Sequence, residues 1–142
     1  SVVDLYECLK MVAQQNADFD QNKAMEVMES MMQAHQDIDA VFCGNDAMAM
    51  GAYQAILAAG KEGKIKVFGF DGADDCVNAI REGKVEATGM QFPKTMAVTA
   101  ATLADKYIKG ERNLPKKLPV AVDLVHKKNV SQYGNFGKLD QN

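Results

Sequence analysis

Four side chains at the ends of predicted strands offer hydrogen-bonding groups and one aromatic face: Phe19, Asn45, Asp71 and Gln91. Asn45 and Gln91 can each donate and accept hydrogen bonds, and the carboxylate of Asp71 can accept from two adjacent hydroxyls. The ring of Phe19 can pack on the apolar C–H face of a sugar. Because charge-assisted hydrogen bonds contribute about 1.5–3 kcal/mol each, this set suits a neutral, hydroxyl-rich ligand.

Three of these side chains, and the neighbouring Asp46, also have a structural interpretation. Asp46, beside Asn45, is better explained as a helix cap than as a ligand group. Asp71 could form a turn before a glycine, Asn45 could satisfy backbone groups, and Phe19 could belong to the core. All four alternatives holding together at four strand ends is a much weaker explanation than a shared site.

Other chemistries find no support in the sequence. We see no Ser/His or Cys/His pair that would activate a nucleophile, and no carboxylate pair with separable environments for acid–base hydrolysis. The phosphate-binding patterns G-x-G-x-x-G and G-K-[ST] do not occur. We therefore expect no catalytic residue and no cofactor.

The histidines and cysteines do not indicate a metal or redox site. His35 and His126 stand about 90 positions apart without acidic or cysteine neighbours at ligand spacing. No C-x-x-C occurs among Cys8, Cys43 and Cys76, and three is an odd number, so at least one thiol is free or pairs between chains. We expect buried or inert thiols, and we expect Cys43 to lie inside a buried strand.

The elements that position the four residues alternate regularly between strand and helix. The predicted strands are 9–14, 40–44, 65–70, 85–90 and 119–125. The predicted helices are 20–35, 46–59, 73–82 and 93–109, with Asp20 and Asp46 as N-terminal caps and Gly60, Gly83 and Gly110 after three helix ends. This alternation predicts an α/β fold, a Rossmann-like repeat with a mostly parallel sheet, whose ligands bind at the carboxyl ends of the strands.

Composition agrees with a globular domain. The 142 residues are 47% hydrophobic and 25% charged, and 16 basic against 19 acidic side chains give a net charge of −3. With no basic face, nucleic-acid binding is not expected. No apolar run approaches the ~20 residues of a membrane helix.

Two further patterns concern packing. Met25, Met28 and Met32 recur on one helical face, which is typical of core filling. The chain begins at Ser1 and at once shows a helix-like apolar pattern that resembles the last turns of a helix, so we expect a fragment of a longer protein. The pattern consists of Val2, Val3, Leu5, Tyr6 and Leu9.

Five segments in this order resemble the second half of ribose-type periplasmic sugar-binding proteins, the solute receptors of ABC importers. They are A-D-F-D (17–20), A-V-F-C-G-N-D-A-M-A-M-G (40–51), V-F-G-F-D-G (67–72), I-R-E-G-K (80–84) and A-T-G-M-Q-F-P (87–93). The similarity extends from about Ser1 to Val130. The stretch from Ile80 to Pro93 favours a transport receptor over a regulator.

The resemblance implies one lobe of a type I periplasmic binding protein, extracytoplasmic, with a sugar or polyol clamped between two lobes and passed to a membrane permease. Carried over by motif, Phe19 would stack on the sugar while Asn45, Asp71 and Gln91 would bind its hydroxyls. Residues 1–91 would form part of the second lobe and 92–118 would pack on the first. Residues 119–142 would form a final strand and an irregular tail.

In the absence of the first lobe, the apolar face of the helix 93–109 would be uncovered, and such a patch favours association. Two other functions remain open. One is the effector-binding domain of a lactose-repressor-type transcription regulator. The other is a flavodoxin-like or hydrolase enzyme using Asp71, which lacks a second carboxylate two residues on.

Overall fold

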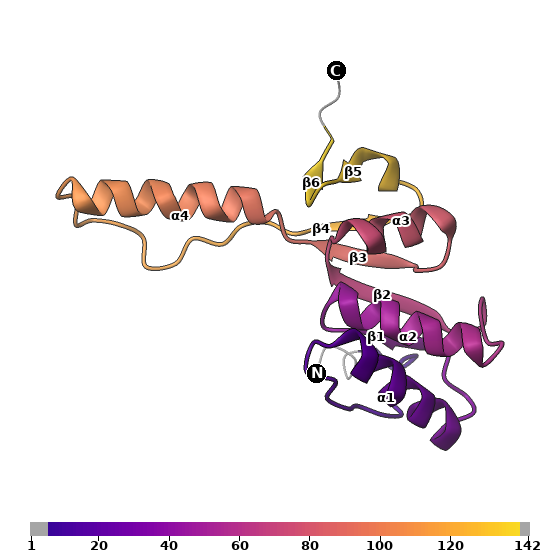
Figure 1. Ribbon diagram of the computed structural model, residues 1–142. Coiled ribbons are helices and arrows are strands. Elements are labelled where there is room, and N and C mark those ends of the chain that lie inside the picture. Colours follow the sequence, from indigo (N-terminus) through magenta and orange to yellow (C-terminus); the bar gives the residue numbers. More distant parts are fainter. Residues whose placement is uncertain (1–5, 140–142) are drawn as a thin grey trace.

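The computed structural model describes residues 6–139, which form a four-stranded sheet with helices and a small C-terminal hairpin (Figure 1). The strands are β1 (Ala40–Phe42), β2 (Lys66–Asp71), β3 (Ala87–Met90) and β4 (Asp123–His126), in the spatial order β1-β2-β3-β4. β1, β2 and β3 are parallel, and β4 runs antiparallel to β3. The mostly parallel α/β architecture predicted from the alternation is confirmed.

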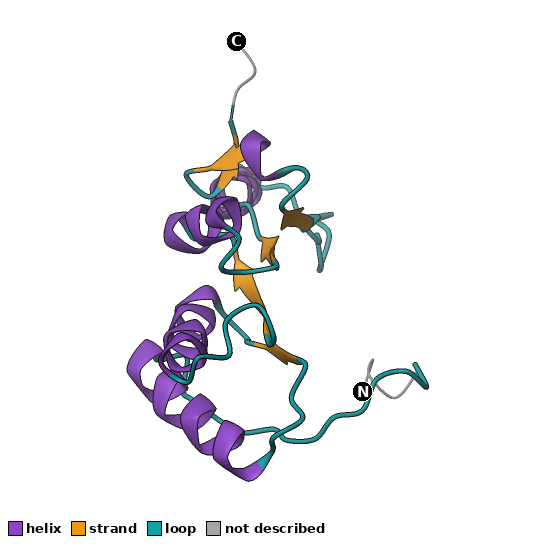
Figure 2. Cartoon of the chain, turned by 90° about the vertical axis from the view of Figure 1, so that its right-hand side faces the viewer, coloured by secondary structure: helices purple, strands orange, loops and turns teal. Residues whose placement is uncertain are grey.

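Four helices connect and flank the strands: α1 (Gln21–Ala34), α2 (Asp46–Ala58), α3 (Asp74–Glu82) and α4 (Pro93–Ile108). α1 packs on α2, and α2 packs on β2. Both lie on one side of the strands, at the bottom of Figure 2. A 3₁₀ turn, η2 (Val130–Gln132), leads into the hairpin of β5 (Tyr133–Gly134) and β6 (Gly137–Lys138). Within residues 6–139, no helix combines the length and apolar character needed to span a bilayer.

The core lies between the sheet and the helices and includes the methionine stripe. Met28 and Met32 are buried, and Met25 packs against the same cluster, so the core role predicted for this stripe is confirmed. Asp20 caps α1 as predicted, because its Oδ1 accepts from the backbone N–H of Lys23 at 2.8 Å. The predicted glycines past three helix ends all have positive φ: Gly60, Gly83 and Gly110.

The strand predicted over 9–14 is absent from the structure, and this prediction is wrong. Leu9 and Met11 are exposed, and no backbone pairing joins this segment to β1. Apolar side chains favour a strand only where a neighbouring strand supplies a hydrogen-bonding ladder and a surface to bury them. β1 is consequently an edge strand. The helical end predicted from Ser1 to Leu9 falls mostly on residues 1–5, outside the described residues.

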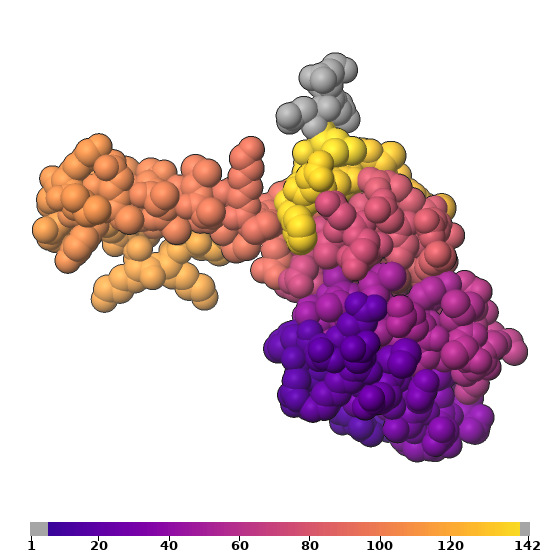
Figure 3. Space-filling model, in the orientation of Figure 1, coloured from indigo at the N-terminus to yellow at the C-terminus, as the bar shows by residue number. Residues whose placement is uncertain are grey.

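The last strand and the longest helix also differ from expectation. β4 occupies Asp123–His126 rather than 119–125, since only its final residues reach β3. α4 matches its predicted range but projects away from the sheet together with the segment that returns to β4 (Figures 1 and 3). No residue of α4 is buried, so its apolar face is uncovered, as expected above.

Candidate functional site

Three of the four predicted site residues follow the carboxyl ends of the parallel strands. Asn45 lies after β1, Asp71 ends β2, and Gln91 directly follows β3. Because these strands are parallel and in register, their carboxyl ends share one edge of the sheet. Phe19 comes from the loop before α1 and reaches the same edge through a contact with Asn45.

Asn45 joins Phe19 to the start of α2. Its Nδ2 donates to the carbonyl oxygen of Phe19 at 3.3 Å, and its Oδ1 accepts from the backbone N–H of Met48 at 2.9 Å. A Cβ placed on Gly44 would lie 3.4 Å from the Phe19 ring, so the ring sits beside the β1–α2 turn. With 68% of its surface exposed, Phe19 is not a core residue and presents an aromatic face to solvent.

The turn that carries Phe19 is fixed by local hydrogen bonds. Asn16 accepts from the backbone N–H of Asp18 at 3.0 Å and donates to its carboxylate at 2.5 Å. Lys23 pairs with the same carboxylate, and this hydrogen bond lowers the pKa of Asp18. Asp18 and Phe19 both have positive φ, 50° and 56°. Asn16, Asp18 and Lys23 therefore hold Phe19 outward, a role that sequence reasoning missed because side chain–backbone turns leave little trace in a pattern.

Asp71 and Gln91 are paired directly. Nε2 of Gln91 donates to Oδ1 of Asp71 at 2.5 Å, and the backbone N–H of Gln91 donates to the Asp71 carbonyl at 3.1 Å. Both residues are half-buried. One hydrogen-bonding amide and one carboxylate thus lie together at the edge of the sheet, partly accessible to a ligand.

The helix cap predicted at Asp46 lies one residue earlier. Asn45 is the N-cap of α2, while Asp46 is the first helical residue and only 1% exposed. The Asp46 carboxylate accepts from the backbone N–H groups of Gly72 and Ala73, at 2.8 and 2.7 Å. These residues follow Asp71, so Asp46 links the Asn45 end of the site to the Asp71 end.

The cysteines and histidines supply no competing centre. Cys43 and Cys76 are buried, and burial raises the pKa of both thiols, that of Cys43 to about 12, with the nearby Asp46 carboxylate adding to the shift. Such thiols are poor nucleophiles. Cys8 is exposed. Within residues 6–139, no three His, Cys, Asp or Glu side chains cluster in a way that could hold a metal ion.

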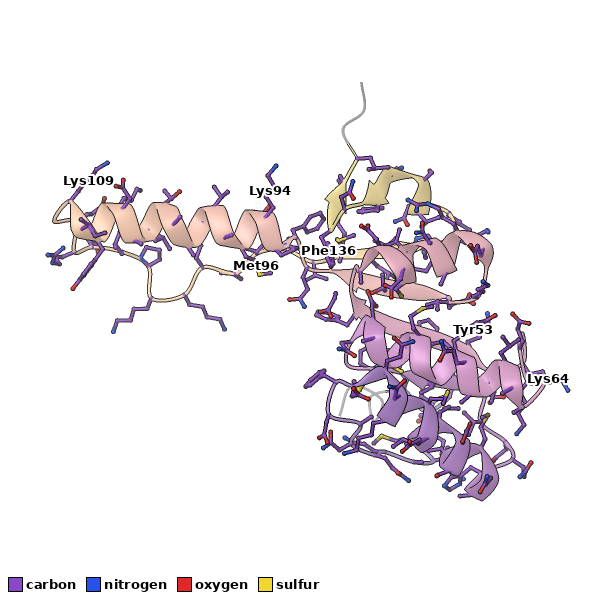
Figure 4. The ribbon with its side chains drawn as sticks, viewed as in Figure 1. Tyr53, Lys64, Lys94, Met96, Lys109 and Phe136 are labelled. Atoms are coloured by element: carbon purple, nitrogen blue, oxygen red, sulfur yellow. The ribbon has the colours of Figure 1, made fainter. Side chains whose placement is uncertain are left out.

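A groove of about 350 Å³ lies between α4 and the segment returning to β4. Gln91 stands at one end, and Figure 4 shows Met96 near the base of the helix. The rest of its lining is mainly apolar: Thr99, Ala100, Leu103, Pro115, Lys116, Leu118, Val120 and Val122. The groove therefore continues from the candidate site along the uncovered face of α4.

Comparison of the sequence with known proteins identifies a matching family and several relatives. The family model described as periplasmic binding protein domain matches residues 2–112. The ribose import binding protein of Salmonella typhimurium is 43% identical over 117 residues, which is 82% of this chain and 39% of that protein. The D-apiose import binding protein of Paraburkholderia graminis is 40% identical over 98% of this chain and 43% of its own length. The chain thus spans about two-fifths of these curated relatives.

Solved structures agree with the sequence matches. A periplasmic solute binding protein of an ABC transporter from Actinobacillus succinogenes, with bound D-allose, has a TM-score of 0.88 and 32% identity, over 92% of this chain and 46% of that one. The Caulobacter myo-inositol binding protein, bound to myo-inositol, has a TM-score of 0.84 and 31% identity, over 92% and 45%. From its sequence match and its fold alike, this chain belongs to the periplasmic binding protein family.

Proposed function

We propose that this chain forms one wall of a monosaccharide or polyol site in the substrate-binding component of an ABC importer. The observation that carries the proposal is the hydrogen-bonded pair of Asp71 and Gln91 on the same sheet edge as Asn45 and Phe19. The names of the relatives support it, since those proteins are import binding proteins for ribose and D-apiose.

Each side chain has a distinct part in the proposed site. The free oxygen of Asp71 accepts from a sugar hydroxyl, and the amides of Asn45 and Gln91 donate and accept with neighbouring hydroxyls. The exposed ring of Phe19 covers an apolar C–H face of the sugar. The site binds and releases its ligand without chemical change, so the protein is not an enzyme.

The other wall of the site comes from a second lobe, as the 39% and 43% coverage of the relatives supports. In this proposal residues 1–91 belong to the present lobe, 92–118 pack on the other lobe, and 119–142 complete the sheet and tail. The two lobes close around the sugar by a hinge movement. The closed form then docks on a membrane permease, outside the cytoplasm.

Titration of the isotope-labelled chain with D-ribose, D-allose, D-apiose and myo-inositol tests the proposal. We expect at least one to shift the backbone amides of Asn45, Asp71 and Gln91 in a saturable way, and to be recovered unchanged. Succinate, an anionic solute without a sugar ring, serves as the control and should shift none of them. No saturable shift with any of the four would contradict the proposal.

An importer receptor is preferred over a regulator because the named relatives are import binding proteins. A helix-turn-helix segment upstream of Ser1 in the natural protein would reverse that preference.

A further inference from the structure

The carboxylate of Asp46 is buried and makes three hydrogen bonds to two other elements. Its Oδ2 accepts from the backbone N–H groups of Gly72 and Ala73, and its Oδ1 accepts from the hydroxyl of Thr88 at 2.6 Å. Asp46 and Thr88 are each 1% exposed. Burying a carboxylate costs free energy unless its oxygens are fully hydrogen-bonded, so Asp46 can occupy this position only when all three donors are in place.

Each element that meets at Asp46 carries a candidate ligand residue. Asn45 directly precedes Asp46 at the start of α2. Gly72 and Ala73 directly follow Asp71. Thr88 lies in β3, whose end leads into Gln91. One carboxylate thus connects the backbone segments that present all three polar side chains.

The backbone beside Asp71 needs such support. Asp71 has φ of 129°, which is unusual for a residue with a side chain, and Gly72 has φ of 83°. A Cβ on Gly72 would lie 2.3 Å from Sδ of Met90, so only glycine fits there. Strained backbone of this kind persists where surrounding contacts determine it, and the two N–H bonds to Asp46 are those contacts.

A glycine in β2, Gly69, provides the space that the Asp46 carboxylate occupies. A Cβ on Gly69, in β2, would lie 2.2 Å from Oδ1 of Asp46. The absence of a side chain at Gly69 therefore lets the start of α2 approach the sheet closely enough for Asp46 to reach both β3 and the loop after β2.

We propose that Asp46, together with Thr88, is a positioning residue for the sugar site. It does not touch the ligand, because it is buried; it fixes the Asp71 carboxylate and the Asn45 amide relative to each other. This inference rests on the proposed sugar-binding function. It predicts that loss of the Asp46–Thr88 bond weakens sugar binding beyond what loss of stability explains.

The decisive variants are Thr88→Val, which keeps the shape but removes the donor, and Thr88→Ser, which restores a hydroxyl. Ile56→Val is the matched control, since Ile56 is buried in α2 away from the site and its truncation also lowers stability. Sugar affinity and unfolding temperature are measured for each, with Asp46→Ala as a fourth variant. If Asp46→Ala does not fold, the Thr88 pair still decides the question.

We expect Thr88→Val to lower the affinity for the best-binding sugar about tenfold and Thr88→Ser to recover most of it. Ile56→Val should lower the unfolding temperature with unchanged affinity. Equal affinities in Thr88→Val and the original chain, or an equal loss in Ile56→Val, would overturn the inference. If the unsubstituted chain binds no sugar, the proposed function fails. The positioning role of Asp46 is then tested separately by the NMR shifts of the Asp71 and Gly72 backbone amides in Thr88→Val. Shifts equal to those of the unsubstituted chain would reject the positioning role.

Discussion

Gln91 donates to one carboxylate oxygen of Asp71, Oδ1, at 2.5 Å and does not bond the other oxygen, Oδ2. Within residues 6–139 no protein donor is hydrogen-bonded to that Oδ2. The Gln91 amide thus orients the carboxylate while its own carbonyl oxygen stays available. Two of the four candidate ligand groups are fixed relative to each other, so less side-chain conformational entropy is lost when a sugar binds.

Asp71→Asn tests whether the charge of this carboxylate matters for sugar binding. The variant keeps one oxygen for Gln91 but replaces a charged acceptor with a neutral amide. We expect sugar affinity to fall roughly 10- to 100-fold, because charge-assisted hydrogen bonds contribute about 1.5–3 kcal/mol. Calorimetry on the full-length protein measures the loss. Asp105→Asn, an exposed carboxylate paired with Lys109 on α4, is the control and should leave affinity unchanged.

Phe19→Gly separates binding from folding at the aromatic face. Phe19 is largely exposed and has φ of 56°, which glycine adopts without strain. We expect the free energy of unfolding to change by less than about 1 kcal/mol, because relief of strain offsets the greater freedom of the unfolded chain. Sugar affinity should fall about tenfold through loss of the stacked ring.

Denaturant unfolding and calorimetry on the same preparation check both parts of this result. Phe42→Ala, which removes another exposed phenylalanine from the edge strand β1, is the matched control. Sugar affinity that is the same in Phe19→Gly and in the original chain would remove Phe19 from the proposed site.

The helices and the parallel strands could be predicted from sequence because their signals are local. Asp20 caps α1, the methionine stripe packs in the core, and the apolar strands alternate with helices at regular spacing. These features follow from capping chemistry and from helical periodicity, which any short window contains. The same regularity placed Asn45, Asp71 and Gln91 at the carboxyl edge of one sheet.

Features that depend on distant partners could not be predicted. The segment 9–14 has a strand-like composition but lacks a ladder partner in the structure. Asn45 and Asp46 are both good capping residues. Asp46 points inward because it accepts hydrogen bonds from the N–H groups of Gly72 and Ala73, 26 and 27 positions later, and from the Thr88 hydroxyl. The paired carboxylate of Asp71 likewise depends on the register of β2 with β3.

Tyr53 gives the chain an alkaline limit to its stability. Burial, together with a hydrogen bond from its hydroxyl to Glu62, raises the pKa of Tyr53 from 10.0 to about 12. The folded state therefore keeps this proton where the unfolded state loses it. The resulting stabilisation is complete below pH 10 and is lost as the pH rises from 10 to about 12.

Tyr53→Phe should remove this part of the alkaline decline, so that its unfolding free energy depends less on pH in that window than the original chain does. Denaturant unfolding between neutral and alkaline pH measures the slope. Tyr107→Phe, on the exposed tip of α4, is the control and should keep the original slope. Identical slopes in the chain and in Tyr53→Phe would contradict the raised pKa. Tyr53 lies in the second half of α2, whose first residues adjoin the site (Figure 4).

The uncovered face of α4 should make the isolated chain self-associate. Met96 is 37% exposed, Met96 and Leu103 line the groove from one face of the helix, and no residue of the helix is buried. Because burying a methionine or leucine side chain stabilises a contact by about 1.5–3 kcal/mol, Met96→Lys should raise the dissociation constant of the dimer at least about tenfold. Its unfolding temperature should stay unchanged, since α4 contributes no buried residue to the core. Sedimentation equilibrium measures the association, and Leu57→Lys, at an exposed apolar position of α2, is the control. An equal effect of both substitutions would place the contact elsewhere than α4.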